Sequence, residues 1–246
     1  MKTKILALIA ALALLLAACE GVATSSKSGD LGLEEIEYLP TAQSLPDNVA
    51  FRDDLDQDVS ADWGLKVVSG LQEQLLLTQN NGQVRIELLQ NPNDANFLFI
   101  NRDKTYEDVV VQAEFEYRNT TDTFVAVVCR VTDEGWYELR VNNAGHFQLL
   151  KFSQYLADQG KNAHETLSGQ VSRATSFKTG KEPNVISLSC VGNQISAFIN
   201  GEQLIKDRVP LVVEDDSFSS GSIGFGISAT GSTTDIIVDW VEAIKP

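Results

Sequence analysis

Three side chains at alternate positions of one segment have the right types to bind a sugar: Trp136, Glu138 and Arg140. Side chains two residues apart in a strand project from the same face. A shallow saccharide groove needs this combination, because an aromatic ring packs on sugar CH groups while charged groups bind the hydroxyls. Arg130 on the preceding segment and Lys151 on the following one would extend the face. We therefore predict carbohydrate binding by these five residues; a cross-strand ladder of ion pairs ending in one aromatic ring is the alternative.

Candidate catalytic residues are few. Glycoside hydrolysis uses two carboxyl groups, and Glu114 and Glu116 would project from one strand face about 7 Å apart. The pair lacks the central Asp of such sites, and the solvated outer face of a strand whose Phe115 points inward is the favoured explanation. His146 and His164 have no second histidine nearby in the sequence, so neither makes a zinc motif. The sequence also has no Gly-x-Ser-x-Gly motif, and we assign no catalytic residue and no cofactor.

Two acidic loops raise structural calcium as a candidate ion. One contains Asp53, Asp54, Asp56 and Asp58, and the other covers residues 214–216. Calcium prefers oxygen ligands of this kind. The first loop nevertheless lacks the glycine and the final glutamate of an EF-hand, and solvated acidic loops are the alternative.

The amino terminus has the pattern of a secretory signal. Lys2 and Lys4 precede an apolar run, 5–18, that is short for a membrane span. The segment 16–19, Leu-Ala-Ala-Cys, resembles the lipobox of bacterial lipoproteins. That resemblance implies cleavage before Cys19 and acylation of its thiol, with the membrane as a partner through the lipid. Several acyl chains would anchor the chain stably outside the cytoplasm.

The segment after Cys19 has the composition of a tether. Gly, Ser, Thr and Ala with scattered charges cannot bury enough apolar surface to offset the entropy of ordering. We predict a signal peptide over 1–18, a lipidated flexible tether over 19–48 and one folded domain over 49–246.

The charge balance excludes one class of partner. The 246 residues carry a net charge of −15, and removal of 1–18 leaves 17 basic against 34 acidic residues, a net charge of −17. Such a chain is repelled by phosphate backbones, so we expect no nucleic-acid partner.

Two cysteines remain after lipidation, and the expected compartment is oxidising. Cys129 and Cys190 both lie in strand-like runs on apolar faces, and they are predicted to form a disulfide. Two buried free thiols are the alternative.

Period-two alternation and turn residues predict an all-β domain from residue 49 onward. We expect strands near 65–69, 72–78, 84–89, 96–101, 108–118, 123–132, 135–142, 146–152, 184–191, 194–200, 203–206, 222–230 and 234–244. So many short strands in one domain imply a sandwich of two packed antiparallel sheets. The one long irregular stretch covers 153–183, where Tyr155 and Leu156 indicate a helical turn.

Several segments resemble the concanavalin-like, laminin-G-like jelly-roll domains. They are "FRDDLDQDVSADWGLK" (51–66), "YEDVVVQAEFEYR" (106–118), "GWYELRV" (135–141), "ISAFINGEQL" (195–204), "SGSIGFGIS" (220–228) and "TTDIIVDWVEAIKP" (233–246). The chain is also similar to lipoproteins of this class with a cysteine pair in the strands, and to the bacterial 3-keto-disaccharide hydrolase-type domain.

The resemblance implies a β-sandwich but no particular reaction. Retaining glucanases of this architecture carry Glu-x-Asp-x-Glu or Glu-x-Asp-x-x-Glu on a strand, and no such segment occurs here. Non-catalytic glycan binding is therefore the leading hypothesis. A hydrolase acting on a disaccharide or polysaccharide, with Glu114, Glu116, Glu138 and Arg140 as candidates, is the second. Protein–protein adhesion or a structural envelope role is the third.

Overall fold

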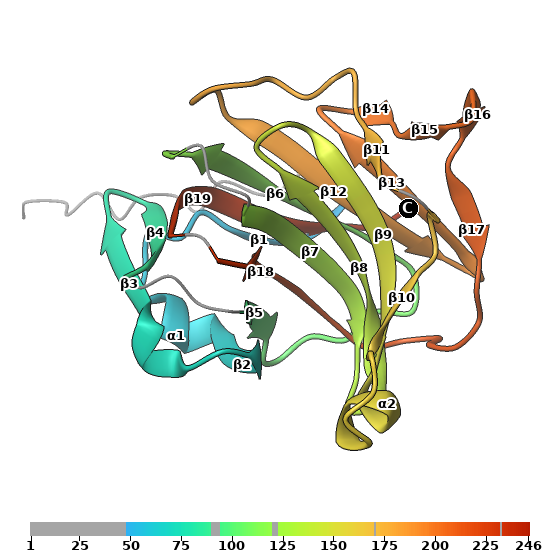
Figure 1. Ribbon diagram of the computed structural model, residues 1–246, viewed down its shortest axis with the longest axis horizontal. Coiled ribbons are helices and arrows are strands. Elements are labelled where there is room, and N and C mark those ends of the chain that lie inside the picture. The colour runs from blue at the N-terminus through green and yellow to red at the C-terminus, as the bar shows by residue number, and fades with distance from the viewer. Residues whose placement is uncertain (1–47, 90–93, 120–122, 170, 232) are drawn as a thin grey trace, which may run out of the picture. The chain divides into compact units, whose positions relative to one another are not determined.

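Strands carry nearly all of the regular backbone, and every pairing between them is antiparallel (Figure 1). The computed structural model describes residues 48–89, 94–119, 123–169, 171–231 and 233–246. The predicted signal peptide, Cys19 and the tether lie outside these residues. Among the described residues, no helix has the length and apolar character to cross a membrane.

Sheet A has nine strands. Its main path runs in the order β14 (Glu202–Gln203), β13 (Gln194–Ile199), β12 (Asn184–Val191), β6 (Val109–Tyr117), β19 (Thr234–Ile244), β4 (Gln83–Leu88) and β3 (Leu75–Asn80). β1 (Val49–Asp53) pairs with β19, and β17 (Val212–Glu214) pairs with β13.

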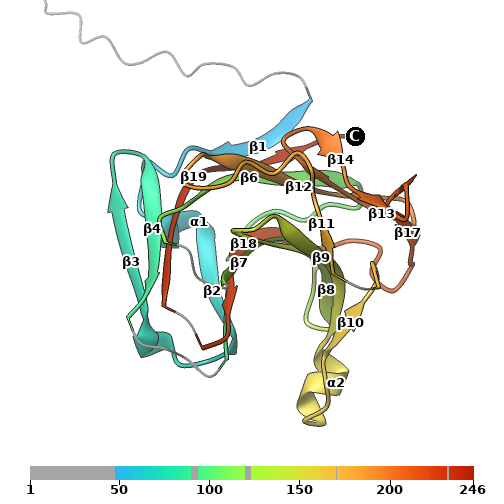
Figure 2. The ribbon, with the colours of Figure 1, turned by 45° about the horizontal axis from the view of Figure 1, so that its top comes forward.

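Sheet B has eight strands and packs beneath sheet A (Figure 2). Its path runs in the order β10 (His164–Thr166), β9 (His146–Ser153), β8 (Gly135–Asn142), β7 (Thr123–Val131), β18 (Ser222–Ala229), β5 (Ala95–Asn101) and β2 (Trp63–Ser69). β11 (Ser172–Arg173) pairs with β9, and β15 (Ile205–Lys206) and β16 (Val209–Pro210) form a separate hairpin. The fold is thus the predicted all-β sandwich of two antiparallel sheets.

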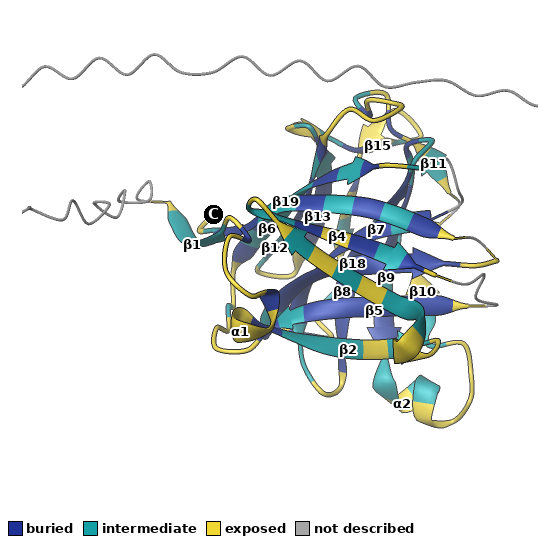
Figure 3. Cartoon of the chain, turned by 90° about the vertical axis from the view of Figure 1, so that its left-hand side faces the viewer, coloured by how far each residue is buried: buried dark blue, intermediate teal, exposed yellow. Residues whose placement is uncertain are grey.

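The core lies between the two sheets because alternate residues of each strand point inward. β6 shows the pattern clearly, since its odd-numbered residues from Val109 to Tyr117 are buried while the residues between them are half-buried. Figure 3 shows the central strands of sheet B, β7 and β18, as largely buried. Burial on both faces of β7 and β18 indicates that the outer face of sheet B is also covered in part.

The predicted disulfide joins the two sheets. Cys129 on β7 and Cys190 on β12 are bonded across the core. The bond closes a separation of 61 residues, which stabilises the fold by about 4 kcal/mol on the chain-entropy account.

The thirteen predicted strands are all present, with ends shifted by a few residues and 203–206 divided between β14 and β15. The helical turn predicted at Tyr155 is α2 (Gln154–Asp158), and the sequence analysis missed α1 (Val59–Asp62) and a 3₁₀ turn (Gln72–Gln74). It also missed β1, β10, β11, β16 and β17, all of five residues or fewer. Strands that short contain too few alternating positions to show a period.

Candidate functional site

Trp136, Glu138 and Arg140 do project from one face of β8. Their neighbours Tyr137 and Leu139 point into the main core, so the three side chains lie on the outer face of sheet B. The Trp136 indole Nε1 donates a hydrogen bond to Glu138 Oε2 at 3.1 Å, and Arg140 Nε donates to Glu138 Oε1 at 2.5 Å. These groups form a connected polar network along one strand.

His164 on β10 completes this network. Its Nε2 lies 2.7 Å from Arg140 Nη2 and 3.6 Å from Glu138 Oε2. A guanidinium has only N–H groups, so the ring nitrogen accepts the hydrogen bond from Arg140. Nothing in the sequence indicates that His164 lies near β8, because β10 and β8 are neighbours only through β9 in the sheet order.

The indole of Trp136 is not an open platform for a sugar, which corrects the prediction. Its side chain is fully buried and stacks on Phe152, with ring centroids 3.8 Å apart. The Lys66 ammonium lies 5.3 Å from the centre of the Trp136 ring. Leu98 and Val128 complete the apolar cluster around it. The aromatic face that a sugar would need is therefore already covered by protein.

Glu138 is fully buried and charged. Burial raises the pKa of a carboxyl group, but here the charge of Arg140 and the hydrogen bond from its guanidinium outweigh burial and lower the pKa to about 2. A group that is ionised at neutral pH cannot donate a proton to a leaving group. Glu138 is thus a poor candidate for a general acid.

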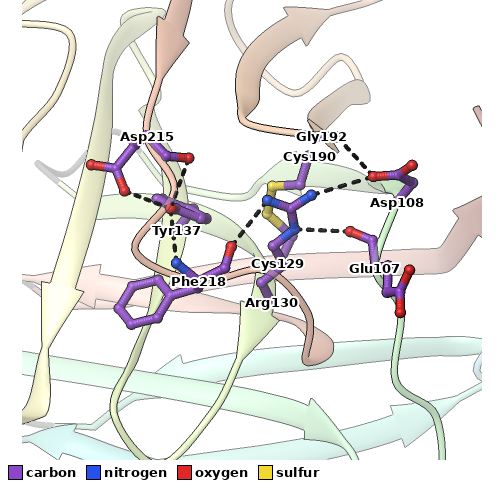
Figure 4. Close-up of a disulfide and its surroundings, with 9 residues drawn as sticks. All are labelled: Glu107, Asp108, Cys129, Arg130, Tyr137, Cys190, Gly192, Asp215 and Phe218. Carbon is purple, nitrogen blue, oxygen red and sulfur yellow. Dashed lines mark hydrogen bonds and ion pairs between the residues drawn. A yellow bond between two sulfur atoms is a disulfide. The ribbon is translucent and has the colours of Figure 1, made fainter.

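Arg130 does not share the face of Trp136, contrary to prediction. Two residues of β7 (129 and 130) stand opposite one residue of β18 (223), a β-bulge, and Arg130 adopts a left-handed φ of 52° within it. The bulge turns the side chain away from the outer face. Its guanidinium donates to the carbonyl oxygens of Glu107 at 2.9 Å and Phe218 at 3.0 Å, next to the disulfide (Figure 4).

Lys151 also lies on the other side of the sheet. It stands opposite Tyr137 in the β8–β9 register, and its Nζ donates to Asp215 Oδ2 at 2.7 Å. Tyr137 shares a hydrogen bond of 2.6 Å with the second oxygen of Asp215 (Figure 4). Burial and this hydrogen bond raise the pKa of Tyr137 to about 12. Arg130 and Lys151 therefore hold the loop at 215–218 to the sandwich and are not placed beside Trp136.

A cavity of about 590 Å³ hollows the outer face of sheet B beside the Trp136 cluster. It is lined by Gly64, Leu65, Lys66, Ile100, Asn101, Arg102, Val131, Thr132 and Asp133. These residues come from β2, from β5 and the residue after it, and from the end of β7 and its turn into β8. Lys66 borders both the cavity and Trp136, so it joins the cavity to the network of Glu138.

The Arg102 guanidinium lies over Gly64. A Cβ atom at Gly64 would stand 3.7 Å from Arg102 Cζ, so the guanidinium rests over the bare backbone of β2. The backbone N–H of Arg102 bonds to the carbonyl of Asp62 at 2.9 Å, which extends the β2–β5 pairing past the last residue of β5. The cavity thus has an apolar floor at Ile100 and Val131 and two cationic side chains at its edge.

The predicted acid pair, Glu114 and Glu116, lies on the outer face of sheet A. Glu114 and Glu116 border a cavity of about 210 Å³ that also includes Asp239. Burial and the charge of Asp239 raise the pKa of Glu114, while Glu116 forms an ion pair with Arg118. This pair remains a candidate for acid–base chemistry, but its cavity is smaller than the 300 Å³ typical of small-molecule sites.

Several acids of the two acidic loops bind protein groups. Asp53 accepts hydrogen bonds from Trp63 Nε1 and the Leu55 amide, and Asp58 accepts one from the Ser60 amide at the start of α1. Asp215 binds Lys151. Across the described ranges, no three His, Cys, Asp or Glu side chains converge as they would around a metal ion.

Comparison with known proteins identifies the fold and no family. No protein-family profile matches the sequence, and no curated protein matches it. Among solved structures, the carbohydrate-binding module CBM66 from Bacillus subtilis matches with a TM-score of 0.51 and 11% identity over 75% of this chain and 97% of the module. A protein of unknown function with a galectin-like fold, also from Bacillus subtilis, matches with a TM-score of 0.57 and 13% identity over 80% and 96%. A β-glucanase from Bacillus licheniformis matches with a TM-score of 0.52 and 10% identity over 80% and 98%.

The chain has a jelly-roll fold. The structural neighbours include both a sugar-binding module and an enzyme, and at these identities they establish architecture alone. The sequence resemblance to jelly-roll domains is confirmed at the level of the fold. The narrower similarity to 3-keto-disaccharide hydrolase-type domains remains a prediction.

Proposed function

We propose that this protein is an extracytoplasmic lipoprotein, anchored through Cys19, whose sandwich binds a saccharide without cleaving it. The binding site is the cavity on the outer face of sheet B. Its volume of about 590 Å³ lies within the range of small-molecule sites, and it combines an apolar floor with polar groups at the edge. The jelly-roll neighbours named as a carbohydrate-binding module and a glucanase support a sugar ligand.

The acids of sheet B support binding over hydrolysis. Among the described strand positions that face outward from sheet B, Glu138 is the one carboxylate, and it is buried and bonded to Trp136 and Arg140. Glycosidases of either stereochemistry need two carboxyl groups flanking the scissile bond, one of them able to donate a proton. The proposal rests on this observation: the one outward-facing carboxylate of these strands, Glu138, is already bonded to protein groups.

Hydrolysis at Glu114 is the second candidate. The raised pKa of this residue and the neighbouring Asp239 suit a general acid next to a second carboxylate. A screen for release of reducing sugar, comparing the wild type with Glu114→Gln, tests this candidate. Turnover that Glu114→Gln abolishes would replace the binding proposal with an enzyme.

The binding site is tested by Gly64→Leu in the full-length protein. Gly64 has no positive φ, and a Cβ there meets nothing closer than 3.7 Å, so the leucine enters the cavity without backbone strain. We expect the variant to lose binding to whichever saccharides a glycan array detects for the wild type. Thr78→Leu is the matched control, because it adds the same leucine at an exposed position of β3 that lines none of the four cavities.

Binding that survives Gly64→Leu would place the saccharide elsewhere on the protein. An array on which the wild type binds nothing, with no hydrolysis, would favour the adhesion or structural role. Circular dichroism of each variant checks that the sandwich has formed.

A further inference from the structure

The cavity on sheet B has the opposite charge balance to the rest of the protein. Lys66 and Arg102 line it with a single acid, Asp133, in a chain whose net charge is −15. Three other cavities of the described residues are lined by more acids than bases. Among these four linings, this is the one with more basic than acidic residues, and a negatively charged ligand would explain that difference.

Neither cation is neutralised by the protein. Lys66 and Arg102 have no carboxylate within ion-pair distance in the described structure, whereas the cations next to the other cavities, Arg130 and Lys151, each bind an aspartate. The Lys66 ammonium contacts only the face of Trp136, at 5.3 Å from the ring centre. Both groups therefore keep N–H donors for a ligand.

The two cations also lie within reach of one ligand. The Arg102 guanidinium rests over Gly64, and Lys66 projects from the same face of β2 two residues further on, a separation of about 7 Å along the strand. Both side chains are long enough to converge on one anionic group or to bind neighbouring groups of one oligosaccharide. The guanidinium matches the two oxygens of a carboxylate or sulfate, while the ammonium acts as a point charge.

We infer that the saccharide bound by this cavity is acidic, with a carboxylate or sulfate group held between Lys66 and Arg102. This inference rests on the proposed function and specifies the class of ligand. The apolar floor at Ile100 and Val131 packs on the sugar ring, and the acidic substituent points to the two cations. Asp133, the one acid on the lining, disfavours anionic groups at its own side and so orients the substituent toward β2.

The test compares four ligands by isothermal titration calorimetry with the full-length protein. Trigalacturonate carries carboxylates, a carrageenan oligosaccharide carries sulfates, galactotriose is neutral, and inorganic sulfate is an anion without a sugar. We expect at least one acidic oligosaccharide to bind at least tenfold more tightly than galactotriose, since each charge-assisted hydrogen bond contributes about tenfold or more.

The double variant Lys66→Gln/Arg102→Gln should lose that preference and bind the acidic and neutral sugars alike. Lys161→Gln/Lys181→Gln is the matched control, because it removes two exposed cations that line none of the four cavities and changes the net charge equally. The control should keep the wild-type preference.

Each other outcome overturns the inference in a recognisable way. Equal binding of neutral and acidic sugars that Gly64→Leu abolishes would leave the proposed site intact and refute the acidic ligand. Inorganic sulfate that binds as tightly as the oligosaccharides would make the cavity an anion site. Binding of none of the sugars, here or on a glycan array, would refute the proposed function itself.

Discussion

Burial separates the polar residues of sheet B that can meet a ligand from those that hold the fold together. Trp136 and Glu138 have the residue types of a sugar site, but both are fully buried and bonded to their neighbours. Lys66 and Arg102 are ordinary cations in the sequence, yet they border the cavity with free donors. Strand alternation identifies the face on which a side chain lies, but not whether another side chain covers it.

The buried Glu138–Arg140 pair makes a prediction about stability at low pH. The pKa of Glu138 is about 2 in the folded chain, below the ordinary value of 4.5, so its contribution is complete above about pH 4.5 and disappears as the pH falls through 2. A shift of this size corresponds to about 3 kcal/mol. Glu138→Gln leaves the partly buried Arg140 without its counter-ion, and we expect it to lower the free energy of unfolding at pH 7 by about 3 kcal/mol.

Urea unfolding at pH 7, 4 and 2.5 measures this effect. The difference between wild type and Glu138→Gln should shrink as the pH falls, because protonation neutralises the wild-type glutamate too. Glu165→Gln is the control, since Glu165 forms an exposed ion pair with Lys151 and should change stability by less than about 1 kcal/mol. A difference that stays the same at all three pH values would show that Glu138 contributes no charge-dependent stability.

At the scale of the elements, β18 is the strand around which sheet B is built, and it carries two glycines on the outer face. A Cβ at Gly224 would lie within 3 Å of side-chain atoms of Ile100 and Val128, and one at Gly226 would lie 2.1 Å from the carbonyl oxygen of Phe97. The spacing of these glycines resembles a phosphate-binding loop only if the surrounding strand pattern of β18 is ignored. In the strand they let β5 and β7 approach closely and bring Ile100 to the cavity.

Gly226→Ala should therefore be strongly destabilising, although alanine is the smallest change available. The added methyl meets backbone, which cannot rotate away, so the strands must separate. We expect the free energy of unfolding to fall by about 3 kcal/mol or more, at the upper end of overpacking effects. Ser228→Ala on the same face of β18 is the control and should change stability by less than about 1 kcal/mol, both measured by urea denaturation. Similar stability of the two variants would contradict the close approach at Gly226.

The elements also show how far sequence analysis reaches. Alternation of apolar and polar residues over six or more positions predicted each long strand, because its inward and outward faces differ in residue type. The bulge at Arg130 breaks the period by one residue, so the predicted face of that side chain was wrong. The predicted face of Lys151 was wrong because two adjacent leucines on β9 allow either set of alternate residues to face the core. Only the pairing of Lys151 with Tyr137 shows which set does.

The cavity could not be predicted from the sequence for a related reason. Arg102 follows the end of β5 and has no strand phase of its own, and its guanidinium lies over Gly64 on the neighbouring strand β2. Contacts between strands that are far apart in the chain leave no local signal. The disulfide was predictable because few cysteines were left to pair and each lay on an apolar face.

At the scale of the whole molecule, the net negative charge of the chain opposes contact with an anionic membrane, whereas the proposed lipid on Cys19 would hold the chain there. The mature chain would carry a net charge of −17, which repels anionic headgroups, so we expect the sandwich itself not to bind an anionic bilayer. The proposed acyl chains on Cys19 supply attachment at about 0.8 kcal/mol per buried methylene. The domain would thus be held near a surface that repels it, which favours exposure of its binding cavity to ligands in solution.

This balance predicts that attachment depends on Cys19 alone. In cells that produce the full chain, the wild type should sediment with membranes and resist extraction by 1 M salt, because acyl burial is not screened by ions as charge attraction is. Cys19→Ala should move to the soluble extracytoplasmic fraction, and Cys129→Ala/Cys190→Ala, which removes the other two thiols, should stay with the membrane. Mass spectrometry of the mature wild type should find an acylated amino-terminal cysteine. If Cys19→Ala remained membrane-bound, or if salt released the wild type, the polypeptide itself would be binding the membrane and the lipid anchor would be refuted.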